Sequence, residues 1–167
     1  AQRQAIQGRR PIALVAAATV LAAGAAFSVV GPGYGEAAAA TGSTSAEKAE
    51  VPYEPYSPAR LAELRAEGRP VFVNYTAAWC VSCQVNDRVA LSTKGVAAAM
   101  KAHNVAYLKA DWTKKDADIA AELARYGRAG VPLYLVYGAD GADGVILPSI
   151  LTEGIVVKAL NKAAAKG

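Results

Sequence analysis

The sequence is poor in cysteine and histidine: its 167 residues include two cysteines, Cys80 and Cys83, and one histidine, His103. Two cysteines cannot build the disulfide framework of a small secreted domain, which generally needs about four or more. A structural metal site needs about four ligands, more than the cysteines and His103 supply together. The two cysteines are therefore expected to act as one pair, with no metal and no other cofactor.

The sequence also lacks a stripe of lysine and arginine residues interleaved with aromatic residues. Such a stripe is typical of nucleic-acid-binding proteins, so nucleic acid is not an expected partner. The net charge of +4 comes in part from Arg3, Arg9 and Arg10, which precede the first apolar run. That run, residues 11–30, carries no charged side chain at all.

Residues 11–30 are long enough to cross a hydrocarbon core of roughly 30 Å as a helix. The arginines within residues 1–10 would hold that end in the cytoplasm as a short flank. A signal peptide cleaved near residues 37–40 is the alternative, although its apolar region should be shorter. A buried helix is disfavoured by the Gly/Pro-rich stretch that follows. Both leading interpretations predict export of the rest of the chain. Since the first residue is Ala1 rather than Met, the run also fits the last span of a multi-pass protein.

Residues 31–57 show no apolar periodicity, are rich in small residues and contain several prolines towards their end. This composition predicts a flexible linker. For the last few residues, around Tyr53 and Tyr56, an irregular part of the folded domain is the alternative. The pattern becomes regular from residue 58, which predicts one domain over residues 58–167.

The regular part alternates between helical and strand patterns. One helix begins at the N-cap Ser57 and stops at Gly68, and the last helix is capped by Thr152. The expected strands are residues 71–77, 105–111, 131–138 and 145–147, and the other expected helices are residues 80–103, bent near residues 92–95, and 114–127. This order predicts an α/β fold with a central mixed sheet of about four strands, flanked by helices. A tight Gly/Asp turn is expected to join the last two strands as an antiparallel hairpin.

Cys80 and Cys83 stand where a predicted strand ends and a helix begins, directly after Trp79. The first turn of a helix presents free N–H groups and the positive end of its dipole, which would lower the pKa of the Cys80 thiol. Cys83 lies one turn inward, close enough for a disulfide but less exposed. Cys80 is therefore the expected nucleophile and Cys83 the resolving thiol. Trp79 is expected to shield the pair and to offer an apolar contact surface.

Pro132 opens a later predicted strand, directly after Val131. The order of the elements directs this strand towards the loop that carries Cys80. A cis Val131–Pro132 bond would leave the backbone of Val131 free to pair with an extended peptide near the nucleophile. A trans proline at the start of an edge strand is the alternative. The cysteine motif in the matching place favours the cis bond.

Trp-Cys-x-x-Cys after a strand and Val-Pro before a later strand resemble the thioredoxin fold. More narrowly, three segments resemble the C-terminal domain of the DsbD family of membrane thiol:disulfide interchange proteins: TAAWCVSCQVND, GVPLYLVYGADG and LPSILTEGIVVKAL. The resemblance covers roughly residues 58–162. It implies a protein-disulfide reductase domain in the periplasm, held at the bacterial inner membrane. Its implied partners are a membrane electron-donor domain and periplasmic thioredoxin-like or disulfide-bearing proteins. A monomer is expected.

The resemblance fails at one position. Thioredoxin-like domains usually carry a buried aspartate six residues before the first cysteine, where it can take a proton from the resolving thiol. The residue here is Asn74, which cannot act as a base. Asp87 is the expected substitute, because it lies one helical turn after Cys83 on the same face. A carboxylate there would raise thiol pKa values and relay the proton. A solvated surface charge is the alternative.

The resemblance implies that the domain relays electrons from the membrane domain to periplasmic disulfide partners, and other functions compete with this role. A stand-alone, membrane-anchored thioredoxin-like reductant in cytochrome c maturation is the nearest. A strong oxidase is disfavoured, because Val81 and Ser82 between the cysteines supply no cation to stabilise the thiolate further. A copper chaperone that uses the same cysteines is the non-catalytic alternative.

Overall fold

The computed structural model describes residues 49–165. The predicted membrane helix at residues 11–30 and most of the predicted linker lie outside the described residues. Within residues 49–165, no helix combines the length and the apolar character needed to cross a membrane.

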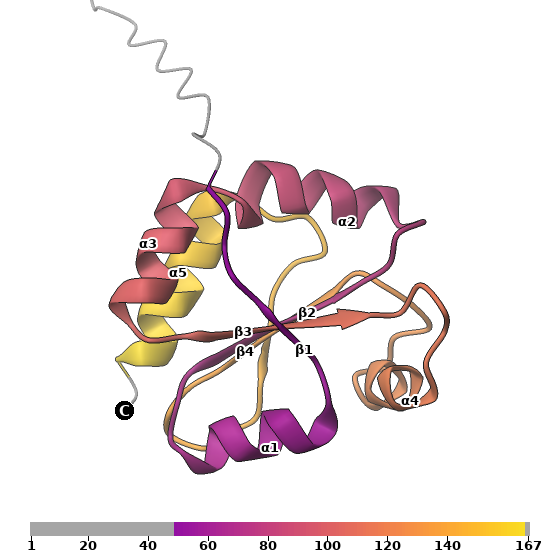
Figure 1. The fold of residues 1–167 in the computed structure, drawn as a ribbon, viewed down its shortest axis with the longest axis horizontal. Helices are drawn as coiled ribbons and strands as arrows, with labels where there is room; N and C mark the ends of the chain where they lie inside the picture. Colours follow the sequence, from indigo (N-terminus) through magenta and orange to yellow (C-terminus); the bar gives the residue numbers. More distant parts are fainter. Residues whose placement is uncertain (1–48, 166–167) are drawn as a thin grey trace, which may run out of the picture. The chain divides into compact units, whose positions relative to one another are not determined.

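The described chain folds around one mixed sheet (Figure 1). Five strands lie in the order β1-β3-β2-β4-β5. β1 and β2 run parallel to β3, while β4 is antiparallel to both β2 and β5. The strands are β1 (Glu54–Pro55), β2 (Val71–Thr76), β3 (Ala106–Asp111), β4 (Leu133–Tyr137) and β5 (Val145–Ile146). This sheet confirms the predicted α/β class and adds β1 to the expected four strands.

Helices cover both faces of the sheet, as predicted. They are α1 (Pro58–Ala66), α2 (Val81–Asn86), the π-helix η1 (Asp87–Leu91), α3 (Lys94–Ala102), α4 (Ala117–Arg125) and α5 (Glu153–Ala164). In Figure 1, α2, α3 and α5 lie on one side of the strands and α1 and α4 on the other. A hydrophobic core lies on each face of the sheet, and alternate residues of β2 point into one or the other. Phe72 packs in the core under η1, α3 and α5, while Val71 and Val73 pack against α1 and α4.

The predicted helix caps are confirmed. The hydroxyl of Ser57 accepts the N–H of Arg60, and Thr152 caps α5 in the same way. Gly68 follows α1 with a φ of 66°. Glycine adopts this left-handed conformation without the strain that a side chain would add.

The predicted helix at residues 80–103 is divided, and the expected bend becomes a complete break. α2 passes directly into the π-helix η1, and α3 restarts after Thr93. The buried hydroxyl of Thr93 donates to the carbonyl of Ala90 (3.0 Å) and accepts the N–H of Val96 (3.4 Å). Thr93 therefore closes one helix and caps the next.

The end of the predicted linker is a folded part of the domain. β1 pairs with the outer edge of β3, and the N–H of Tyr56 donates to the carbonyl of Lys109 at 2.9 Å. Val51 packs against the core on one face of the sheet, and Tyr56 packs against the core on the other face. Residues 49–56 of the predicted linker thus belong to the folded domain. Backbone hydrogen bonds to β3 hold this segment in place. A strand as short as β1 shows no alternation of apolar residues, so the sequence pattern did not indicate it.

The connection between β4 and β5 also differs from the prediction. The two strands form the expected antiparallel pair, with Val136 opposite Val145. The prediction of a tight turn was wrong, because residues 138–144 form a longer loop between the two strands. The repeated Gly/Asp pattern in this loop offers several turn positions, and the sequence alone did not distinguish among them.

Candidate active site

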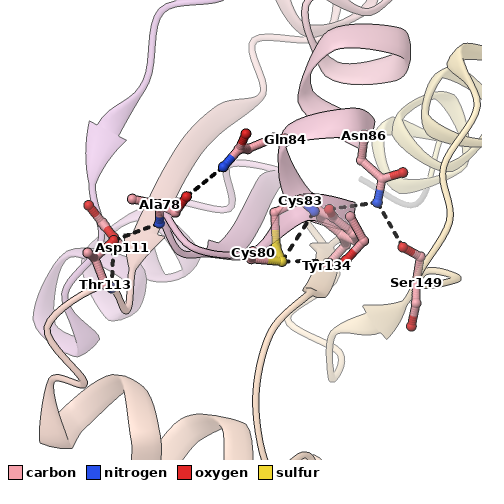
Figure 2. Close-up of a disulfide and its surroundings, with 10 residues drawn as sticks. Ala78, Cys80, Cys83, Gln84, Asn86, Asp111, Thr113, Tyr134 and Ser149 are labelled. Carbon is pink, nitrogen blue, oxygen red and sulfur yellow. Dashed lines mark hydrogen bonds between the residues drawn. A yellow bond between two sulfur atoms is a disulfide. The ribbon is translucent and has the colours of Figure 1, made fainter. Parts of the chain in front are cut away.

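The two cysteines meet at the start of α2, directly beyond the end of β2. They form a disulfide, with their Cα atoms 5.3 Å apart (Figure 2). Cys80 is the N-cap residue, with extended backbone, and its sulfur accepts the backbone N–H of Cys83 at 3.2 Å. The hydroxyl of Ser82 lies 3.5 Å from the same sulfur. A negative charge that develops on Cys80 therefore meets donors already in place.

The disulfide is almost enclosed by protein. Cys80 is 6% exposed and Cys83 is 3% exposed, so Cys83 is the more buried of the two, as predicted. Both pack with Ala77, and Val131 lies against this small cluster. The Val131–Pro132 bond is cis, which confirms that prediction. The loop before β4 thus comes to the cysteines, as the order of the elements indicated.

Trp79 lies beside the disulfide as an open aromatic surface. It is 52% exposed. Its Nε1–H donates to the carbonyl of Thr113 at 3.3 Å, and its ring centroid lies 6.0 Å from that of Trp112. The expected apolar contact surface is therefore present. Sequence reasoning missed Trp112, which lies far from the motif along the chain and has no spacing that links it to Trp79.

A turn after β3 holds the loop that carries the cysteines. The backbone N–H of Ala78 donates to the hydroxyl of Thr113 at 2.8 Å, and that hydroxyl donates to the carboxylate of Asp111 (Figure 2). The hydrogen bonds from the side chain and backbone of Thr113 hold the pKa of Asp111 below its ordinary value. No spacing or motif in the sequence indicates this contact between two loops.

Asn86 fastens α2 to the rest of the domain. Its side chain is fully buried. Its Nδ2 donates to the hydroxyl of Tyr134 (2.9 Å) and to the carbonyl of Ser149 (2.7 Å), and its Oδ1 accepts the N–H of Leu151 (3.0 Å). Burial raises the pKa of Tyr134, and the negative charge of Asp87 adds to that rise. Sequence reasoning missed Asn86, because its partners lie in distant segments.

Asn74 and Asp87, the two residues that depart from the expected pattern, lie on different elements. Asn74 is buried in β2, where its Nδ2 donates to the hydroxyl of Tyr107 at 2.9 Å. Asp87 is half-buried at the start of η1 and lines a hollow of about 230 Å³ that Cys83 also lines. Asp87 and Cys83 thus line the same hollow. Burial raises the pKa of Tyr107, and the negative charge of Asp87 also contributes.

The sequence also matches a known family. Residues 52–139 match the family model described as thioredoxin-like. The chain belongs to the thioredoxin-like family.

Named relatives narrow the comparison for this thioredoxin-like domain. It is 36% identical over 83 residues to the thiol:disulfide interchange protein DsbD of Pseudomonas fluorescens, a match that covers 50% of this chain and 14% of that protein. It is 38% identical over 76 residues to DsbD of Ralstonia nicotianae, covering 46% of this chain and 12% of that protein. The chain thus matches only a small part of the length of these relatives.

Solved structures show the same thioredoxin fold. The oxidised C-terminal domain of DsbD from Neisseria meningitidis aligns with a TM-score of 0.54 and 21% identity, over 67% of this chain and 99% of that one. A thioredoxin from Thermus thermophilus aligns with a TM-score of 0.56 and 22% identity, over 70% of this chain and 89% of that one. At these identities the likeness shows the fold.

The described part of the thioredoxin-like domain contains no cluster of three or more histidine, cysteine or acidic side chains placed to hold a metal ion. The ring of His103, at the C-terminal end of α3, lies 2.9 Å from the side-chain oxygen of Asn161 in α5. The reactive group that the site contains is the disulfide between Cys80 and Cys83.

Proposed function

We propose that this domain is a protein-disulfide reductase that relays electrons by dithiol–disulfide exchange at Cys80 and Cys83. One observation carries the proposal: the two cysteines form a disulfide at the N-terminal end of α2, and Cys80 sulfur accepts a backbone N–H there. The relatives called thiol:disulfide interchange proteins support it from the sequence side.

In the reduced domain, the thiolate of Cys80 attacks one sulfur of a partner disulfide. A Cys80–partner disulfide forms, the partner's own S–S bond breaks, and its other sulfur leaves as a thiolate that takes up a proton. Cys83 then loses its proton and attacks the sulfur of Cys80. The Cys80–Cys83 disulfide forms, and the second partner sulfur leaves and is protonated. Two electrons and two protons have passed to the partner, and a donor dithiol reverses the sequence to recharge the domain.

The surrounding residues have distinct proposed roles. The backbone of Val131, held before Pro132 against the cysteine cluster, pairs with the extended segment that carries the partner disulfide. Trp79 supplies an exposed apolar surface next to Cys80. Asp87 accepts the proton that Cys83 releases, in place of the acid that Asn74 does not provide.

The relay places the domain in the periplasm, at the bacterial inner membrane. The uncharged run at residues 11–30, with Arg9 and Arg10 before it, supports a membrane helix whose leading residues 1–10 stay in the cytoplasm. The partners are a membrane electron-donor domain and periplasmic thioredoxin-like or disulfide-bearing proteins, and the domain acts as a monomer.

Trapping the mixed disulfide tests this proposal. In Cys83→Ala the thiol of Cys80 still attacks, but nothing resolves the product, so a partner should stay covalently attached until reductant is added. The matched control is the double variant Cys80→Ala/Cys83→Ala, which should retain nothing.

The identity of the captured protein distinguishes the electron relay from the alternative, a stand-alone reductant in cytochrome c maturation. Capture of other thiol oxidoreductase domains supports the relay. Capture of apocytochrome c supports the stand-alone reductant instead. If Cys83→Ala captures no more than the double variant, while Cys80 reacts freely with a thiol reagent, the reductase proposal is wrong.

A further inference from the structure

A groove of about 230 Å³ lies between α5 and the loop of residues 138–144. It is at the end of β4 that is remote from the disulfide. Val131, which precedes β4, packs against the cysteines, whereas Gly138, which follows β4, lines the groove. None of the residues that line the groove belongs to the cysteine cluster. The groove is therefore separate from the candidate active site.

Apolar side chains line most of the groove. Val136 is 2% exposed and belongs to the core under α5, so it lies at the base of the groove. Ile155, Ala159 and Ala163 follow one another at four-residue intervals along α5 and line one wall. Val145 of the edge strand β5 lines another wall and is 50% exposed. A concave apolar surface of this kind favours an apolar ligand.

The loop of residues 138–144 is held in place as a further wall. The Nη2 of Arg65, on α1, donates to the carbonyls of two consecutive loop residues, at 2.8 and 3.1 Å. Its guanidinium also lies 4.8 Å from the ring centroid of Tyr137. Gly144 passes close to the same ring, since a Cβ on this residue would lie 2.8 Å from two ring carbons. These contacts hold the loop against the sheet, so the fold itself forms this wall.

Two lysines line the groove from the side of the helix. Lys158 and Lys162 are one turn apart on α5, and both are exposed. Neither takes part in a salt bridge among residues 49–165. Like charges at this spacing repel each other, so an anion bound between the two ammonium groups would be stabilised by both and would relieve their repulsion.

Two acidic side chains line the groove from the loop. One of them, Asp140, accepts the N–H of Ala142 at 3.2 Å. The other, Asp143, is exposed. The groove thus carries positive charge along α5 and negative charge along the loop. An anionic group is favoured beside α5 and disfavoured beside Asp143, which gives the charged head of a ligand one preferred place.

We propose that this groove binds a single-chain aliphatic anion of the fatty-carboxylate class. The alkyl chain lies along the apolar base and walls, and the carboxylate lies between Lys158 and Lys162. Burial of the chain removes apolar surface from water, and the paired lysines select a negative head. The inference goes beyond the proposed reductase function and does not depend on it.

Photolabelling of the whole chain tests the inference. The probe is decanoate with a diazirine on its alkyl chain, and mass spectrometry locates the label. Labelling should be saturable, should fall in residues 138–145 and 153–164, and should be displaced by unlabelled decanoate. Decyltrimethylammonium, which joins an equally apolar chain to a positive head, should compete about tenfold more weakly or worse.

Charge variants test the part played by the lysines. In Lys158→Gln/Lys162→Gln, displacement by decanoate should need about tenfold more competitor, because the head loses its charged donors. The matched control Lys101→Gln/Lys114→Gln removes the same charge from two exposed lysines outside the groove and should change nothing.

Two further variants give effects that a loss of folding would not produce together. Asp143→Asn should tighten the binding of decanoate about two- to threefold, because it removes a nearby negative charge. Ala159→Leu fills the groove and should abolish the saturable labelling. Circular dichroism checks that each variant is folded.

Three results would overturn the proposal. The first is label that falls outside the groove or is not saturable. The second is displacement by decanol or decyltrimethylammonium that equals displacement by decanoate. The third is a dimer, measured by light scattering, that Ala159→Leu dissociates, since the groove would then be an interface between two copies of the chain. Loss of partner trapping by Cys83→Ala would leave the labelling unchanged, so a failure of the reductase function is distinguishable.

Discussion

At the scale of single residues, Asn86 shows how one buried amide sets the position of the active site. α2 is short, so its own backbone bonds hold it weakly. Asn86 is the last residue of α2, and its three hydrogen bonds connect the helix to β4 and to the loop before α5. The helix whose first turn holds both cysteines is thus anchored at its far end.

Asn86→Ala should lower the free energy of unfolding by about 2–4 kcal/mol, because it leaves buried donors and acceptors unpaired. Chemical denaturation of the oxidised protein measures this loss. Gln84→Ala, an exposed amide on the same helix with one bond to the carbonyl of Ala78, is the matched control and should lose less than about 1 kcal/mol. Equal losses in the two variants would contradict the anchoring role.

The reacting residues were largely predictable from the sequence, and the residues that hold them were not. Cys80, Cys83 and the Val131–Pro132 bond belong to short local patterns with a physical meaning at a strand–helix junction and a strand start. Asn86 and Thr113 act on the site through partners far away in the sequence. No spacing rule links them, so only the fold brings them together.

At the scale of elements, the turn after β3 is hydrogen-bonded to the loop that carries the cysteines and holds it in position. Thr113 bridges the two, since it accepts the N–H of Ala78 and donates to Asp111. Its hydrogen bonds favour the ionised carboxylate and lower the pKa of Asp111 in the folded state. Asp111 therefore contributes stability above its unfolded pKa, and this contribution is lost as the pH falls through the lower folded pKa.

Asp111→Asn removes this titration and keeps a side-chain oxygen that can accept from Thr113. The parent should be more stable than Asp111→Asn near neutral pH, and the difference should shrink from about pH 5 downwards and be small at about pH 2. Denaturation curves of both proteins across this range give the comparison. Because the carboxylate is exposed, the difference should also narrow in high salt. A difference that is constant with pH would refute the pKa assignment.

Elements differ in how well the sequence specified them. α1 and α5 were placed from their caps, because Ser57 and Thr152 satisfy free N–H groups by a local rule. The π-helix η1 and the long β4–β5 loop had no such rule. Asn86 and Leu91 are five residues apart and both are buried. A π-helix, with one extra residue in its turn, brings both to the interior, and tertiary packing rather than a local rule requires this.

At the scale of the whole molecule, the folded domain includes residues 49–56. The segment before α1 contributes β1, the contact of Val51 with the core, and the ring contacts of Tyr53 with Tyr107 and of Tyr56 with Tyr75. It also covers the outer edge of β3. Residues 49–56 and the cysteine site therefore belong to one folded domain.

Two shortened chains test this boundary. One that begins at Ala49 should keep the free energy of unfolding of the parent domain. One that begins at Ser57 should lose about 2–4 kcal/mol, because it gives up apolar burial and the backbone bonds to β3. Chemical denaturation measures both, and far-ultraviolet circular dichroism checks that each is folded. Equal stability of the two chains would return residues 49–56 to the linker.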